Sequence, residues 1–143
     1  MTTKITTFTI DFYEDVLALW QQCEGIGLND ADSRENMQAY LNLNPEMSFV
    51  AVADDRVVGS ILAGHDGRRG YINHLAVHPS CRLQGIGRAL VVHATDALRS
   101  KGIQKAHIFI FNTNASGAAF WESVGWTSRD DIAVMSKVLA PGS

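Results

Sequence analysis

One segment of the chain constrains the fold more than any other: an apolar run that leads through a glycine-bearing turn into an amphipathic stretch. We expect a central strand at Tyr71–Val77, which stops before Pro79, and a helix at Ala89–Lys101, which ends at Gly102. The apolar run Ala106–Phe111 then predicts another strand. Because a strand, a helix and a strand in this order form a right-handed crossover, these two strands should be parallel.

Shorter patterns on either side of this unit predict a sheet flanked by helices. The other expected elements are, in chain order, a strand at Ile5–Ile10, a helix from near Asp11 with Asp11 and Glu14 as its capping pattern, a helix from near Asp32 or Ser33 to Asn44 and Pro45, a hairpin of Ser48–Ala53 and Val57–Ala63, a helix at Ala115–Ser123, and a final strand within Ile132–Val138. No repeat or linker interrupts them, so we expect one mixed sheet in a single domain over residues 1–143.

Composition excludes several classes of protein. At 143 residues and 46% hydrophobic content, the chain can enclose one sizeable core. It has no apolar run approaching the roughly 20 residues that span a membrane. Its N-terminus lacks the basic start and the long apolar stretch of a signal peptide, so we expect a cytoplasmic protein. Cys23 and Cys81 are too few for a disulfide framework and are expected to be free thiols.

The charges are distributed unevenly along the chain. Residues 1–55 contain ten acidic and two basic residues, a net charge of −8, whereas the whole chain carries −3 and the remainder therefore +5. The acidic part could favour a cationic ligand; the alternative is that both sets are simply solvated faces. The overall charge argues against nucleic acid. Many of the bases fall around the glycine turn: Arg68, Arg69, Arg82, Arg88, Arg99, Lys101 and Lys105.

The turn from Arg82 to Arg88 has the chemistry of an anion site. Gly85 and Gly87 let the backbone approach a ligand closely, and the start of the following helix leaves several amide hydrogens without a partner. The helix dipole adds about half a positive charge there, so a pyrophosphate is a natural occupant. Spacing alone leaves a plain tight turn as the alternative, since the third glycine of the dinucleotide fingerprint and the Walker Gly-Lys-Ser/Thr are missing.

Two motifs make a resemblance specific. The run "LAVHPSCRLQGIGRAL", residues 75–90, resembles the acyl-CoA signature of the GNAT N-acetyltransferase superfamily, with Arg82, Gly85 and Gly87 in the family's Arg/Gln-x-x-Gly-x-Gly/Ala places. Downstream, "NASGAAFWESVGW", residues 114–126, is similar to the family's Asn-containing helix. The first helix and the turn Asp66–Gly70 further resemble the bacterial YpeA-like branch. The implied fold is α+β: a mixed, mostly antiparallel sheet of about six to seven strands with a splayed parallel pair, and about four helices.

The resemblance also implies a co-substrate and its contacts. The co-substrate would be acetyl-CoA or another acyl-CoA, with no metal, and an amine would attack the thioester directly without an acyl-enzyme. The pantetheine arm would pair with the central strand as an added strand. The implied contacts are the backbone of Leu75, Ala76 and Val77, the side chain of Arg82, the amides of Leu83, Gln84, Gly85, Ile86, Gly87 and Arg88, the side chain of Asn114, and, near the sulfur, Phe120 and Trp121.

Two departures from the family pattern concern proton transfer. Trp121 stands where the family often has a tyrosine that protonates the departing thiolate, and an indole N–H can donate a hydrogen bond but not a proton. Asn73 and His74 stand where relatives often carry a carboxylate. His74 is therefore our candidate for proton acceptor, because imidazole is largely unprotonated at neutral pH. The alternative is an ordinary histidine on a sheet face, with backbone carbonyls and water taking the proton.

The remaining expectations concern the acceptor and competing functions. Glu24, Asn29 and Asp30 lie in a loop that should border the site of the amine acceptor. A rival interpretation from another class is a non-catalytic module that binds coenzyme A, motivated by Trp121 and Asn73. The histidines form no helical metal pair, so no metal is expected. The acceptor's identity and the choice between monomer and homodimer stay open.

Overall fold

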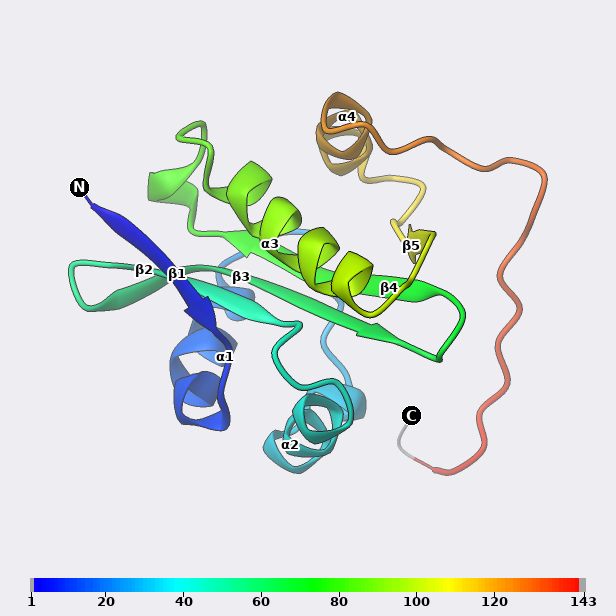
Figure 1. Cartoon of the computed structure of the whole chain (residues 1–143), viewed down its shortest axis with the longest axis horizontal. Coiled ribbons are helices and arrows are strands. Elements are labelled where there is room, and N and C mark those ends of the chain that lie inside the picture. The colour runs from blue at the N-terminus through cyan, green and yellow to red at the C-terminus, as the bar shows by residue number, and fades with distance from the viewer. Residues whose placement is uncertain (1, 142–143) are drawn as a thin grey trace.

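The computed structural model describes residues 2–141 and shows one five-stranded sheet with the order β1-β2-β3-β4-β5. Neighbouring strands are antiparallel except β4 and β5, which are parallel (Figure 1). The parallel pair confirms the crossover predicted around the glycine turn. The strands are β1 Thr3–Thr7, β2 Phe49–Ala53, β3 Arg56–His65, β4 Gly70–Val77 and β5 Ala106–Ile108.

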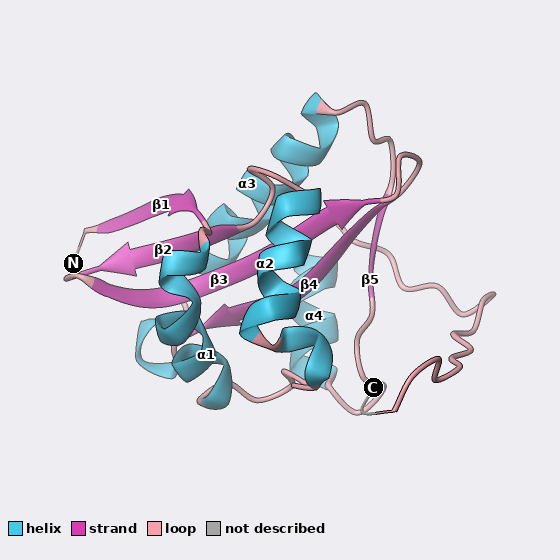
Figure 2. Ribbon diagram, turned by 90° about the horizontal axis from the view of Figure 1, so that it is seen from below, coloured by secondary structure: helices cyan, strands magenta, loops and turns pink. Residues whose placement is uncertain are grey.

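Within residues 2–141, four α-helices cover the two faces of the sheet. Helices α1 and α2 lie on one face, and α3 and α4 lie on the other (Figures 1 and 2). The four helices are α1 Tyr13–Gln21, α2 Arg34–Leu43, α3 Ile86–Ser100 and α4 Ala115–Ser123, and three short 3-10 turns are η1 Ile10–Phe12, η2 Asp30–Asp32 and η3 Pro79–Cys81. The α+β class implied by the resemblance is confirmed, with five strands where six to seven were expected.

Each face of the sheet has its own hydrophobic core. On the α1 and α2 face, Val16, Leu19 and Trp20 of α1 pack with Met37 of α2 and Leu62 of β3. On the opposite face, the buried side chains of α3, among them Ile86, Leu90, Ala94 and Leu98, pack against β2, β3 and β4. Because alternate strand residues point to opposite faces, β3 contributes to both cores and is almost completely buried.

The first helix begins later than its capping pattern predicted. A 3-10 turn at Ile10–Phe12 comes between β1 and α1, and neither Thr9 nor Phe12, at the N-cap positions, forms a side-chain capping bond. The capping role expected for Asp11 and Glu14 is therefore wrong. The second helix is capped as expected near Ser33, whose hydroxyl accepts a hydrogen bond from the Asn36 amide at 3.2 Å.

The final strand predicted within Ile132–Val138 is also wrong. Residues after α4 run along the outside of the molecule beyond β5 without pairing (Figure 1), and Ile132, Val134 and Met135 are 58%, 66% and 95% exposed. A strand needs a hydrogen-bonding edge beside it. Within the described residues, the edge of the sheet on this side is β5, which keeps strand geometry for three residues, Ala106–Ile108, instead of the six predicted.

Candidate active site

The parallel strands β4 and β5 pair only at their beginnings. The register runs from Gly70 opposite Ala106 to Ile72 opposite Ile108, and pairing stops there. Beyond Ile72 the edge of β4 that faces away from β3 has no neighbouring strand among the described residues, so the backbone of residues 73–77 has no strand partner on that side. An extended chain could add to this edge as another strand. The separation places an opening between β4 and the edge strand β5, as the resemblance implied.

The glycine turn follows directly after this open edge. Leu83 and Gly85 both have left-handed backbone conformations, with φ of +64° and +83°, and Gly85 is the N-cap of α3. Within residues 2–141, none of the amides from Leu83 to Arg88 donates a hydrogen bond to a protein acceptor, and α3 has no side-chain cap. Left-handed residues among successive amides form concavities that bind anions. The turn therefore has the free donors that a diphosphate requires.

The second glycine of the turn brings the two sequence motifs together. A Cβ atom placed on Gly87 would lie 3.3 Å from the Phe120 ring of α4 and 3.7 Å from Val77. Gly87 thus allows α4 to approach the start of α3 closely. Asn114, at the N-cap of α4, accepts a hydrogen bond from the Gly117 amide at 2.9 Å. The motifs at 75–90 and 114–126 therefore form one continuous surface beside the opening.

Three segments meet at the carboxyl end of β4. The guanidinium of Arg82 donates a hydrogen bond to the Val77 carbonyl at 3.1 Å, and the Cys23 thiol lies 3.6 Å from the same oxygen. Burial raises the pKa of Cys23, although the neighbouring Arg82 opposes this. Arg82 therefore holds the turn against the strand, and its side-chain position is set by a carbonyl of the open edge.

The loop after α1 lies across the same opening. A Cβ atom on Gly25 would lie 2.9 Å from the Asn114 side chain, and one on Gly27 would lie 3.2 Å from the Phe111 ring. Glu24, Asn29 and Asp30 belong to this stretch and are exposed. That this loop borders the acceptor site stays a prediction. Asn29 has a structural role, because its side chain accepts a hydrogen bond from the Ala31 amide at 2.8 Å.

A bulge in β4 determines where His74 points. Ser60 of β3 pairs with Ala76 and Leu62 pairs with Asn73, so His74 and Leu75 together oppose the single residue Ile61. His74 is the extra residue of this bulge, and its backbone has a φ of +48°. Without the bulge, His74 would face α3 like Ile72; with it, His74 lies on the α1 and α2 face. A non-glycine residue held in this conformation costs about 1–3 kcal/mol and is common at functional sites.

His74 forms a hydrogen-bonded pair with Asp32 that the sequence did not reveal. Its Nε2 lies 2.8 Å from Oδ1 of Asp32, and the two side chains are only 18% and 9% exposed. The edge of the imidazole also packs against the ring of Trp20, with 4.8 Å between centroids. The sequence pattern indicated Asp32 only as a possible start of the second helix. Because 42 residues separate the partners, no local pattern could have joined them.

Asn73 lies beside a buried phenol. Its side chain is next to the hydroxyl of Tyr40, and burial raises the pKa of Tyr40 to about 12. Within the described residues this hydroxyl is buried without a hydrogen bond of acceptable geometry. A buried donor with no acceptor destabilises the folded state.

We expect Tyr40→Phe to raise the free energy of unfolding by about 1 kcal/mol, because it removes this unpaired donor. Urea denaturation measures the change. The matched variant Tyr13→Phe should lower stability instead, since the Tyr13 hydroxyl donates to the Asp32 carbonyl at 2.6 Å. A Tyr40→Phe protein less stable than Tyr13→Phe would contradict the assignment of an unpaired hydroxyl to Tyr40.

The raised pKa of Tyr40 predicts a loss of stability at high pH. Tyr40 stays protonated in the folded protein at pH values where it ionises in the unfolded chain, so the free energy of unfolding should fall from pH 10 toward pH 12. Urea denaturation at several pH values should show this fall in the native protein and a smaller one in Tyr40→Phe.

Trp121 lies in the hydrophobic core. Its ring packs against those of Trp126 and Phe120, with 4.9 Å and 5.4 Å between centroids, and it is only 5% exposed. Phe120, by contrast, is half-buried and lies against the turn at Gly87. The two aromatic residues therefore differ in position, and Phe120 is the one that borders the glycine turn.

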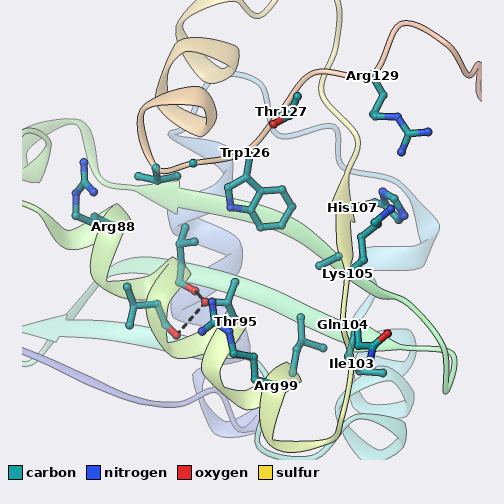
Figure 3. A pocket seen from close by; sticks show the side chains of 16 residues that line it. Arg88, Thr95, Arg99, Ile103, Gln104, Lys105, His107, Trp126, Thr127 and Arg129 are labelled. Carbon is teal, nitrogen blue, oxygen red and sulfur yellow. Dashed lines mark hydrogen bonds between the residues drawn. The ribbon is translucent and has the colours of Figure 1, made fainter.

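A cavity within residues 2–141 lies beside the glycine turn, and His74 does not line it. It has a volume of about 620 Å³ and is formed by α3, β5 and the residues after α4 (Figure 3). Of the residues expected to bind a cofactor, only Arg88 lines it. Arg99, Lys105 and Arg129 add positive charge, although Arg99 and Arg129 pair with Asp96 and Asp131. The cavity extends the basic surface of the turn along α3.

None of the helices within residues 2–141 is long and apolar enough to cross a membrane. In the same part of the chain, no three His, Cys, Asp or Glu side chains are grouped so that they could share a metal ion.

A mixed sheet whose parallel pair separates beside a turn with free amides is the arrangement that the resemblance to the GNAT superfamily implied. Residues 13–126 match the family described as "Acetyltransferase (GNAT) family". The chain is 31% identical over 137 residues to Acetyltransferase SG1711 of Sodalis glossinidius, covering 95% of both chains. It is 29% identical to Acetyltransferase YPTB2753 of Yersinia pseudotuberculosis, covering 95% of this chain and 96% of that one.

Solved structures show the same fold. The PaiA N-acetyltransferase of Thermoplasma acidophilum in complex with coenzyme A superposes with a TM-score of 0.80 at 18% identity, covering 91% of this chain and 92% of the other. AAC(6')-Iy, in complex with a bisubstrate analog, gives 0.76 at 17% identity, covering 96% and 99%. The chain belongs to the GNAT acetyltransferase family, and it is an acyl-CoA-dependent N-acetyltransferase that acts on an amine acceptor. The rival interpretation as a non-catalytic coenzyme A module is not favoured.

Proposed function

We propose that this acetyltransferase acetylates a cationic amine and that His74 accepts the proton which the amine must lose. The observation that carries the proposal is the bulge in β4. It turns His74 toward the acidic face of the sheet, two residues beyond the last pair that joins β4 to β5. An imidazole held there, next to Asp32, lies beside the opening in which the acyl group would be presented.

The residues of the structure fit acetyl-CoA. The free amides from Leu83 to Arg88, together with Arg82, suit its pyrophosphate, and the open edge at Leu75, Ala76 and Val77 suits its pantetheine arm. Asn114 and Phe120 would border it on the α4 side, whereas Trp121, predicted to lie near the sulfur, packs in the core and is only 5% exposed. When bound, acetyl-CoA supplies an activated acetyl group that the amine takes up directly.

The protein then has two tasks, to orient the amine and to remove its proton. An alkylamine whose conjugate acid has a pKa of about 10 is protonated at neutral pH, so it has no free electron pair with which to attack the thioester. His74 takes this proton, which breaks an N–H bond of the ammonium and forms one on the ring. Main-chain and loop groups on the α1 and α2 face hold the amine next to His74, with Glu24, Asn29 and Asp30 as the candidate contacts.

Charge supports a cationic acceptor. The first 55 residues, which supply α1, α2 and the loop between them, carry a net charge of −8. Arg34 is one of their two bases and is already paired with Glu14 at 3.5 Å. Clefts bordered by charge of one sign raise the local concentration of ligands of the opposite sign.

A panel of amines tests this proposal. We expect kcat/KM for a short diamine, whose second ammonium stays charged, to exceed that for a neutral-tailed amine of equal length by about tenfold, and to fall with added salt. Thiol release from acetyl-CoA measures both. Amino acids of the same length, which add a carboxylate, should be poorer than either. Equal or better turnover of neutral or acidic acceptors would remove the electrostatic argument.

A further inference from the structure

We propose that Asp32 is a positioning residue that fixes His74 in one tautomer, so that Nδ1 is the atom that accepts the proton of the amine. This inference rests on the proposed role of His74 and goes beyond it, because it names the ring nitrogen and a second residue for proton transfer. No sequence pattern connected Asp32 with the site.

The hydrogen bonds of Asp32 dictate the tautomer. Its Oδ1 lies 2.8 Å from Nε2 of His74, and its Oδ2 accepts a hydrogen bond from the Asn29 amide at 3.1 Å. An ionised carboxylate can only accept hydrogen bonds, so Nε2 must carry the ring hydrogen. The neutral imidazole then has its free electron pair on Nδ1. Within residues 2–141, Nδ1 has no hydrogen-bond partner.

The surroundings hold this pair in place. Asp32 belongs to η2, whose capping box joins it to Asn29, and its carbonyl accepts the Tyr13 hydroxyl at 2.6 Å. On the other side, Trp20 packs against the imidazole and donates to the Ser60 hydroxyl at 2.9 Å. The carboxylate and the ring are therefore anchored to α1, η2 and β3, which prevents the imidazole from rotating freely.

The titratable groups around His74 suit this role. Asp32 of η2 contacts the His74 ring directly, and the Tyr13 hydroxyl of α1 lies behind Asp32. The thiol of Cys23, after α1, lies near Val77. The Tyr40 hydroxyl of α2 lies beside Asn73. Among the described residues, none of these neighbours is basic. When Nδ1 takes the proton, the ring becomes an imidazolium that keeps its Nε2–H bond to Asp32, so the carboxylate also stabilises the product of the transfer.

Asp32→Asn tests the inference in the full chain. The new amide oxygen can still accept from Asn29, while the amide nitrogen donates to Nε2 and moves the ring hydrogen to Nδ1. We expect kcat with the best amine to fall about 10- to 100-fold, with the Kd for coenzyme A unchanged. Nitrogen-15 NMR of the His74 ring should report the Nε2–H tautomer in the native protein and the Nδ1–H tautomer in the variant. The matched control is Glu35→Gln, which replaces an exposed acid on α2. It should change neither kcat nor the tautomer of His74.

The outcomes separate this inference from the proposed function. If Asp32→Asn keeps full kcat while His74→Gln loses it, the inference fails and His74 remains the proton acceptor. If His74→Gln keeps the native pH profile, the proposed function fails first. Should Asp32→Asn not fold, the native protein alone decides, because an Nδ1–H tautomer in its neutral His74 would overturn the proposal.

Discussion

His74→Gln is expected to lower kcat about 10²- to 10³-fold, within the range that general-base catalysis contributes. The glutamine amide can still donate a hydrogen bond to Asp32 in place of the one at 2.8 Å from His74. The amide cannot, however, take up a proton at neutral pH. The dependence of kcat on pH should also differ between the native protein and the variant, because only the native protein carries an imidazole that can accept the proton. Stopped assays of thiol release across pH measure both effects.

The control is a histidine outside the site. His93 lies exposed on α3 against Phe49, so His93→Gln should leave kcat and its pH profile unchanged. Added imidazole should partly restore activity to His74→Ala, because a free base can enter the space left by the ring. A native acidic limb in His74→Gln would show that backbone carbonyls and water remove the proton, the alternative that the sequence left open.

Gly85→Val is expected to weaken coenzyme A binding at least tenfold, which corresponds to about 1.4 kcal/mol. Gly85 has φ of +83°, a conformation that β-branched residues adopt only with strain. A Cβ atom there would meet no neighbour, so the effect comes from the backbone and not from a collision. To relieve the strain, the backbone of the turn must change conformation. The free amides of residues 83–88 would then no longer point in the same direction. Isothermal titration with coenzyme A measures the loss.

Gly102→Val separates this effect from general destabilisation. Gly102 follows the other end of α3, has φ of +80°, and is equally open around its Cβ position. Both variants should lose similar thermal stability, on the order of 1–3 kcal/mol. Only Gly85→Val should lose coenzyme A affinity. Native affinity in Gly85→Val, or an equal loss in Gly102→Val, would mean that the amides of the turn do not hold the pyrophosphate.

Local sequence patterns predicted most of the elements. The helix Ala115–Ser123 has the bounds that were expected, because Asn114 supplies a cap and Gly125 a stop. The hairpin of β2 and β3 was also predicted, since Asp54 and Asp55 accept the left-handed conformations that its turn requires. The failed strand shows the limit of such patterns. The apolar run within Ile132–Val138 is typical of a strand, but a strand also depends on a neighbouring edge, which a local sequence pattern does not show.

The glycine turn and its free amides follow from the sequence alone, because they depend on residues adjacent in the chain: two glycines, a helix start and a preceding strand. The arrangement around His74 does not. It depends on one extra residue in β4, which reverses the direction of His74, and on Asp32, which reaches it across 42 positions. Backbone conformation at a turn is governed by near neighbours, whereas strand register and side-chain pairing are settled when distant segments pack into a common core.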